Sequence, residues 1–146
     1  MVGLATAAGI LNNHVSPEGI GLTQHPLEAV SELDSSRFIR SLKDAEAKWK
    51  QGVTFVDARQ EDFYWLGHIP GAISLPISDF ETTFPKVQMV LPSSDREIVC
   101  YCSGFGCEES TELAERLLAF GYQRVYVFEG GWPEWSDAGL PVEASE

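Results

Sequence analysis

Short apolar runs rich in β-branched and aromatic residues alternate along the chain with segments whose apolar residues recur at helical spacing. The apolar runs predict buried strands, the clearest of which cover residues 53–57, 73–76, 97–102 and 124–129. The helical segments cover residues 61–67, 77–84, 107–121 and 132–139. Strands that alternate with helices form a parallel sheet, because each connection must cross back over the sheet. We therefore predict an α/β fold with a mostly parallel central sheet and helices on both faces.

The residues ahead of the first strand predict one further helix. Asp34 or Ser35 can cap its start, and Gly52 ends it. Its apolar face would consist of residues at helical spacing: Phe38, Ile39, Leu42, Ala45 and Trp49. Its other face carries five basic residues, which predict either a solvated surface or a contact with an acidic partner or membrane.

The composition is that of one globular domain. The chain has 146 residues, of which 44% are hydrophobic and 22% are charged, so a disordered chain is excluded. Ten basic residues stand against 22 acidic ones, which gives a net charge of −12. A field of this sign repels phosphate backbones and therefore disfavours a nucleic-acid partner. We expect a monomer.

Residues 1–32 differ in character from the rest of the chain. Prolines and glycines interrupt them, so they predict an irregular arm ahead of a folded domain at residues 33–146. The apolar stretch Met1–Leu11 is far shorter than the ~20 residues that a membrane-spanning helix needs. It is either a helix docked on the surface or the end of a membrane anchor, which leaves a cytoplasmic and a membrane-associated location open.

The end of the run at residues 97–102 is where we most expect chemistry. Ligands of open α/β sheets bind beyond the carboxyl ends of the strands, and this strand ends at Cys102. The backbone N–H groups of the following loop and helix start can form an anion cradle, and the same field favours a thiolate. We therefore predict that Cys102 is a nucleophile at an accessible sheet edge. The residues expected to line its substrate site are Ser103, Gly104, Phe105, Gly106, Cys107, Glu108 and Glu109.

Motifs for cofactors and metals are incomplete in this sequence. Gly104 and Gly106 begin a dinucleotide-binding pattern, but Glu109 occupies the position of its third glycine. Cys100 would lie deeper in the sheet than Cys102, and the three histidines form no pair at ligand spacing. We expect neither a cofactor nor a metal ion.

Two long motifs of this sequence are distinctive. The first, FVDARQEDFYWLGHIPGAISLP, contains a D-x-R pattern, Asp57 and Arg59, and a GHIPGA turn. The second, IVCYCSGFGCEESTELAERLLAFGYQRVYVFEGGWPEW, has a strand ending in Tyr-Cys, a loop, a helix ending in Gly-Tyr, a strand and a final G-G-x-x-x-W. Together they resemble the signatures of the rhodanese-like domain family, and the resemblance covers residues 33–141.

This resemblance implies a sulfurtransferase. In the family, a loop cysteine takes a sulfane sulfur from a donor such as thiosulfate, becomes a persulfide and passes the sulfur on. Cys102 stands at the position of that cysteine, and Asp57, Arg59 and Ser110 would support it. The implied partners are a small sulfur-containing anion or thiol, and a carrier protein as sulfur acceptor.

The loop departs from the family pattern in its second half. The usual loop has an arginine directly before a serine at the helix start, but Glu109 precedes Ser110 and the loop is about two residues longer. Ten acidic residues and only two arginines follow position 96, and such a rim repels dianions such as thiosulfate. Phosphatase relatives of the fold need an arginine for their tetrahedral dianion; none lies between Cys102 and Ser110, which disfavours that activity.

The spacing of two cysteines supports a further hypothesis. Cys107 lies five residues after Cys102 with glycines between, so it would resolve a persulfide or sulfenate on Cys102 by forming a disulfide. Three functions therefore stay open: a sulfurtransferase that uses Cys102, a thiol–disulfide redox module that uses both cysteines, and a non-catalytic binding module. In the binding module, Phe105 at the loop centre would contact the partner.

Overall fold

A five-stranded sheet, in which all neighbouring strands run parallel, forms the centre of the molecule. The computed structural model describes residues 33–144, and its strand order is β1-β5-β4-β2-β3. The strands are β1 (Phe38–Ile39), β2 (Thr54–Asp57), β3 (Ile73–Ser74), β4 (Glu97–Tyr101) and β5 (Arg124–Phe128). The predicted α/β fold with a parallel sheet is therefore confirmed, whereas the arm predicted at residues 1–32 lies outside the described residues.

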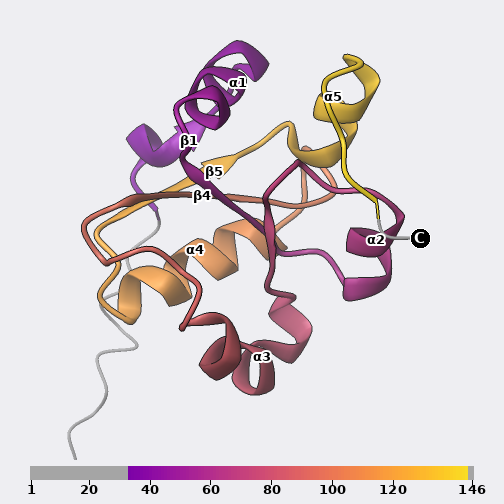
Figure 1. The fold of residues 1–146 in the computed structure, drawn as a ribbon. Coiled ribbons are helices and arrows are strands. Elements are labelled where there is room, and N and C mark those ends of the chain that lie inside the picture. The colour runs from indigo at the N-terminus through magenta and orange to yellow at the C-terminus, as the bar shows by residue number, and fades with distance from the viewer. Residues whose placement is uncertain (1–32, 145–146) are drawn as a thin grey trace, which may run out of the picture.

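Helices cover both faces of this sheet (Figure 1). α1 and α5 lie on one face, and α3 and α4 lie on the other. Within residues 33–144, no helix combines the length and the hydropathy that crossing a membrane requires. The helices are α1 (Leu42–Lys50), α2 (Glu61–Leu66), α3 (Phe80–Val87), α4 (Glu109–Ala119) and α5 (Gly131–Asp137), with 3-10 turns at Ser35–Arg37 and Ile77–Asp79.

The first predicted helix is wrong in its amino-terminal half. Phe38 and Ile39 form strand β1, which pairs with β5 at Val127 and Phe128, and α1 begins only after the cap residue Ser41. The side chain of Ser41 accepts a hydrogen bond from the amide of Asp44 at 3.4 Å. Pairing with β5 gives Phe38 and Ile39 backbone hydrogen-bond partners that are distant in sequence, and these outweigh the local helical spacing of apolar residues.

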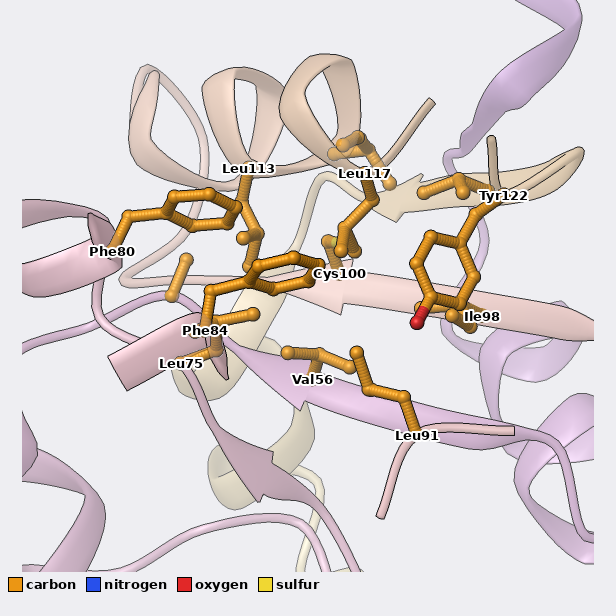
Figure 2. Close-up of a cluster of buried hydrophobic side chains, with 14 of the residues drawn as sticks. Val56, Leu75, Phe80, Phe84, Leu91, Ile98, Cys100, Leu113, Leu117 and Tyr122 are labelled. Carbon is orange, nitrogen blue, oxygen red and sulfur yellow. The ribbon is translucent and has the colours of Figure 1, made fainter. Parts of the chain in front are cut away.

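Alternate strand residues face opposite sides of the sheet and build two separate cores. Figure 2 shows the core under α3 and α4, where Phe80, Phe84, Leu113 and Leu117 from the helices pack on Val56, Ile98 and Cys100 from the strands. The second core lies under α1 and α5 and contains Phe55, Val99, Tyr101, Phe128 and Trp135. Phe120, the C-cap residue of α4, is 56% exposed, with its ring against Phe84 at a centroid distance of 4.5 Å.

The carboxyl ends of the central strands meet along one edge of the sheet. The register pairs Asp57 of β2 with Tyr101 of β4, and Tyr101 with Phe128 of β5. Because the strands are parallel, the residues that follow them leave the sheet side by side. The D-x-R motif, Cys102 and the start of α5 are therefore neighbours in space although they are distant in sequence.

Candidate active site

Strand β4 ends at Tyr101, and Cys102 is the first residue beyond it. The Cys102 carbonyl accepts a hydrogen bond from the amide of Trp132 at 2.8 Å, which fixes the base of the loop to the start of α5. At Gly131, φ is +56°, and a Cβ there would collide with the Cys102 carbonyl oxygen and lie 2.8 Å from the Gly104 nitrogen. Only glycine satisfies both the backbone angle and the close approach.

A disulfide joins Cys102 to Cys107 across the loop, with their Cα atoms 6.5 Å apart. Cys102 is only 2% exposed, because its sulfur is covered by the bridge and by Ser110. The Ser110 Oγ lies 3.1 Å from the Cys102 Sγ, and the hydroxyl is the donor because a disulfide sulfur carries no hydrogen. The accessible thiol expected from the sequence is therefore closed in this state, and a substrate reaches it only after the disulfide opens.

The other loop residues surround the two sulfurs in a short reversal of the chain. The Cys107 amide donates to the Gly104 carbonyl at 3.1 Å, and φ is positive at both Gly104 and Gly106. Ser103, Phe105 and Glu108 are exposed, with Phe105 at 72%, and Glu109 is half-buried at the first turn of α4.

Several amides of this loop have no acceptor within the described part of the chain: those of Ser103, Gly104, Phe105, Gly106 and Glu108. The start of α4 adds further amides, because no side chain caps this helix. Backbone donors in the loop are therefore free, and no residue from Ser103 to Glu109 has a cationic side chain. That these donors hold an anionic sulfur stays a prediction.

Asp57 and Arg59 form a buried ion pair beside the loop. The Arg59 Nε and Nη2 lie 3.0 Å and 2.6 Å from the two carboxylate oxygens of Asp57, and Nη2 also donates to the Gly67 carbonyl at 2.7 Å. The guanidinium centre is 4.9 Å from the ring of Trp132. Because Asp57 neutralises it, Arg59 organises the floor of the site and adds little net positive charge.

Two buried groups next to the site stay protonated at neutral pH. Burial raises the pKa of Cys100 far above that of an ordinary thiol, and burial together with the charge of Asp57 raises the pKa of Tyr101. Cys100 lies in the core beneath Cys102, so it is a packing residue and not a nucleophile.

A pocket of about 400 Å³ opens next to the cysteine loop. Its walls include Phe63 and Leu66 of α2, Trp132 of α5, Ser103 of the loop, Glu109 at the start of α4, and Arg59. The contribution of α2 to this pocket was not predicted from the sequence. Two larger hollows of 640 and 610 Å³ lie away from the two cysteines and contain neither of them.

One group of three potential metal ligands occurs among residues 33–144: Cys102, Cys107 and Glu109, whose ligand atoms lie within 4.8 Å of one another. Two of these are joined in the disulfide, so they offer no thiolate in this state.

Comparison with known proteins agrees with this geometry. A model of the rhodanese-like domain matches residues 41–138. The chain belongs to the rhodanese-like domain family. The BH2092 protein of Bacillus halodurans superposes with a TM-score of 0.64 at 27% identity, covering 75% of this chain and 78% of that one.

The family contains proteins of different kinds. A thiosulfate sulfurtransferase from Pseudomonas aeruginosa superposes with a TM-score of 0.57 at 28% identity, over 70% of this chain and 19% of that one. An HTH-type transcriptional regulator of Mycobacterium tuberculosis is 37% identical over 91 residues, which span 62% of this chain and 38% of the regulator. The chain thus matches only a minor part of these two relatives.

Proposed function

We propose that the domain is a sulfurtransferase that carries a sulfane sulfur as a persulfide on Cys102. The observation that carries this proposal is the position of Cys102, directly after β4 and beneath a loop in which the amides from Ser103 to Gly106 have no acceptor within residues 33–144. Those amides and the Ser110 hydroxyl, 3.1 Å from the sulfur, would stabilise a thiolate and then a persulfide anion. The similarity to a thiosulfate sulfurtransferase supports the same chemistry.

The neighbouring pocket favours an organic sulfur donor over an inorganic dianion. Phe63, Leu66 and Trp132 give it apolar walls, Glu109 adds negative charge, and Arg59 is neutralised by Asp57. A dianion would meet repulsion from the carboxylate without a free cation to offset it. The carbon skeleton of a thiol persulfide would instead cover the apolar walls while its sulfur reaches Cys102.

The test measures sulfur transfer to the reduced protein. Reduced and desalted protein is mixed with cysteine persulfide or with thiosulfate, and its intact mass is followed at early times. We expect a gain of about 32 Da with the organic donor, and little gain with thiosulfate. Cys102→Ser is expected to show no gain with either donor. A mass gain that persists in Cys102→Ser would overturn the assignment of the nucleophile.

The disulfide favours a second candidate, a thiol–disulfide exchange module. Its two cysteines are already joined across a short loop, as in proteins that pass electrons between dithiols. If wild type and Cys107→Ser both fail to gain sulfur, while wild type exchanges its disulfide with a small dithiol, this second candidate replaces the first. If neither reaction occurs, the domain acts as a binding module.

A further inference from the structure

Cys107 takes no part in the transfer proposed above, yet the fold brings its sulfur into bonding contact with Cys102. The turn from Gly104 to Cys107, closed by an amide–carbonyl hydrogen bond of 3.1 Å, returns the chain toward the end of β4. The side chain of Cys107 also packs against the same core cluster that contains Cys102. The meeting of the two sulfurs therefore follows from the local fold and needs no large movement.

The two sulfurs have different polar neighbours. The Ser110 hydroxyl lies 3.1 Å from the Cys102 Sγ and can donate a hydrogen bond to a sulfur that carries negative charge. The Glu109 carboxylate oxygen lies 3.9 Å from the Cys107 Sγ and can accept a proton from a thiol there. These neighbours suit Cys102 as the residue that carries the sulfane sulfur. They suit Cys107 as the thiol that loses its proton when it attacks the Cys102 sulfur.

We propose that Cys107 is a second nucleophile, which resolves the Cys102 persulfide and releases hydrogen sulfide. The inference rests on the persulfide proposed above and names its acceptor, a thiol of the same loop. It adds a reductive half to the reaction, because the sulfane sulfur then leaves as sulfide and is not passed to another carrier.

The step balances without an outside oxidant. Cys107 gives its proton to Glu109, and its sulfur forms a bond to the Sγ of Cys102. The bond between that Sγ and the outer sulfur of the persulfide anion breaks, and the outer sulfur departs with the bonding electron pair. It takes up the proton held by Glu109 as it leaves, so it is released as HS⁻. The outer sulfur is reduced by two electrons, and the two cysteine sulfurs become the oxidised pair of the disulfide.

The disulfide state described above is the product of this step, so turnover requires a dithiol reductant. Cys107 is half-buried whereas Cys102 is buried, so the reductant attacks the sulfur of Cys107 and frees Cys102 first. Each cycle then consumes one donor persulfide and one dithiol, and yields one sulfide, the thiol of the donor and one small disulfide.

A single-turnover experiment tests the inference with the 146-residue chain. Reduced, desalted protein receives one equivalent of cysteine persulfide in the absence of oxygen, and both sulfide and intact protein mass are followed. We expect wild type to release close to one equivalent of sulfide and to end about 2 Da below its reduced mass, as a disulfide requires. Cys107→Ser is expected to keep a gain of about 32 Da and to release sulfide at least tenfold more slowly. Cys100→Ala, which removes the core thiol instead, is expected to behave as wild type.

A second variant addresses the proton acceptor. Glu109→Gln is expected to slow sulfide release by at least about tenfold near neutral pH, and the deficit is expected to shrink as pH rises and the Cys107 thiol ionises unaided. A purely structural role for Glu109 would leave the shape of this pH profile unchanged.

The outcomes separate the two proposals. A persulfide that lives equally long in wild type and in Cys107→Ser overturns the inference and leaves the proposed sulfurtransferase intact. A sulfur found on Cys107 by peptide mapping also overturns it, because the outer sulfur would then be the one attacked. If Cys102 gains no sulfur in either protein, both proposals fall.

Discussion

Two loops meet at the carboxyl edge of the sheet, and they are held in opposite ways. The loop after β2 is fixed by the buried Asp57–Arg59 pair, whose guanidinium also donates to the Gly67 carbonyl. The loop after β4 has one internal backbone hydrogen bond, and is closed by the Cys102–Cys107 disulfide. The first is stabilised by contacts that persist across ordinary conditions, and the second by a bond that a thiol can cleave.

This difference assigns separate tasks to neighbouring segments. Arg59 touches Trp132, and the Trp132 amide binds the Cys102 carbonyl, so the loop after β2 supports the base of the loop after β4. We therefore expect the loop after β4 to change covalent state without disturbing the sheet. A reactive loop on a rigid support is the arrangement that precise group transfer requires.

The largest expected effect comes from removing the reactive sulfur. Cys102→Ser should abolish persulfide formation and sulfide release, because no other thiol lies at the strand end. Circular dichroism of the variant should match that of wild type, since the loop after β2 is untouched. Residual sulfur transfer in this variant would show that Cys102 is not the nucleophile.

The next largest effect is expected at the Asp57–Arg59 ion pair in the loop after β2. Arg59→Met should lower the free energy of unfolding by roughly 3–5 kcal/mol, because it leaves the buried Asp57 carboxylate without its partner. Arg116→Met is the matched control: Arg116 pairs with Glu81 and Glu112 at the surface, so its loss should cost about 0–1 kcal/mol. Urea titration of both variants measures the difference, and equal costs would contradict the rigid role of the loop after β2.

Reduction should weaken the fold less than the loss of Arg59. Opening a disulfide that closes so short a loop restores chain entropy worth about 2 kcal/mol in the unfolded state. Urea titration of wild type with and without a phosphine reductant gives this value, and Cys107→Ser should show no response to the reductant. A decrease in the free energy of unfolding as large as that in Arg59→Met would mean that the disulfide also stabilises the fold as a whole.

High pH should act on the sheet beneath both loops. The raised pKa values of Cys100 and Tyr101 mean that the folded protein holds protons that the unfolded chain releases, so stability falls as pH rises. The loss should begin near pH 8.5 through Cys100, with a slope of up to about 1.4 kcal/mol per pH unit. In Cys100→Ala, the decline should start nearer pH 10, where Tyr101 of the unfolded chain ionises. An onset that is the same in this variant would argue against the assignment to Cys100.

The smallest effect on stability is expected at the pocket wall between the loops. Phe63→Ser and Leu66→Ser change exposed side chains, so each should alter the free energy of unfolding by no more than about 0.5 kcal/mol. Each should nevertheless raise the KM for an organic persulfide several-fold, because apolar contact with the donor is lost. Met89→Ser, at an exposed apolar position outside the pocket, is the control and should leave KM unchanged.

The sequence predicted the sheet and the position of Cys102 after β4 better than the surroundings of the Cys102 sulfur. Apolar runs located β2, β4 and β5, and the parallel topology then placed Asp57 and Cys102 on one edge. Strand β1 was missed, because two residues carry no periodicity of their own and gain their structure from β5. The pocket was also missed, since it depends on how α2 and α5 approach each other in space. The cysteine spacing suggested a disulfide, but it could not show that Ser110 and Glu109 each face a different sulfur.

Gly131 approaches the base of the cysteine loop so closely that a substitution there should inactivate the site without changing either cysteine. One added methyl group at that position would collide with the Cys102 carbonyl and displace the loop, although both cysteines would still be present. A relative with the same fold could therefore keep the cysteine and still be inactive, because of a larger residue at the position of Gly131. A substitution at position 131 should therefore separate a binding function of the domain from sulfur transfer.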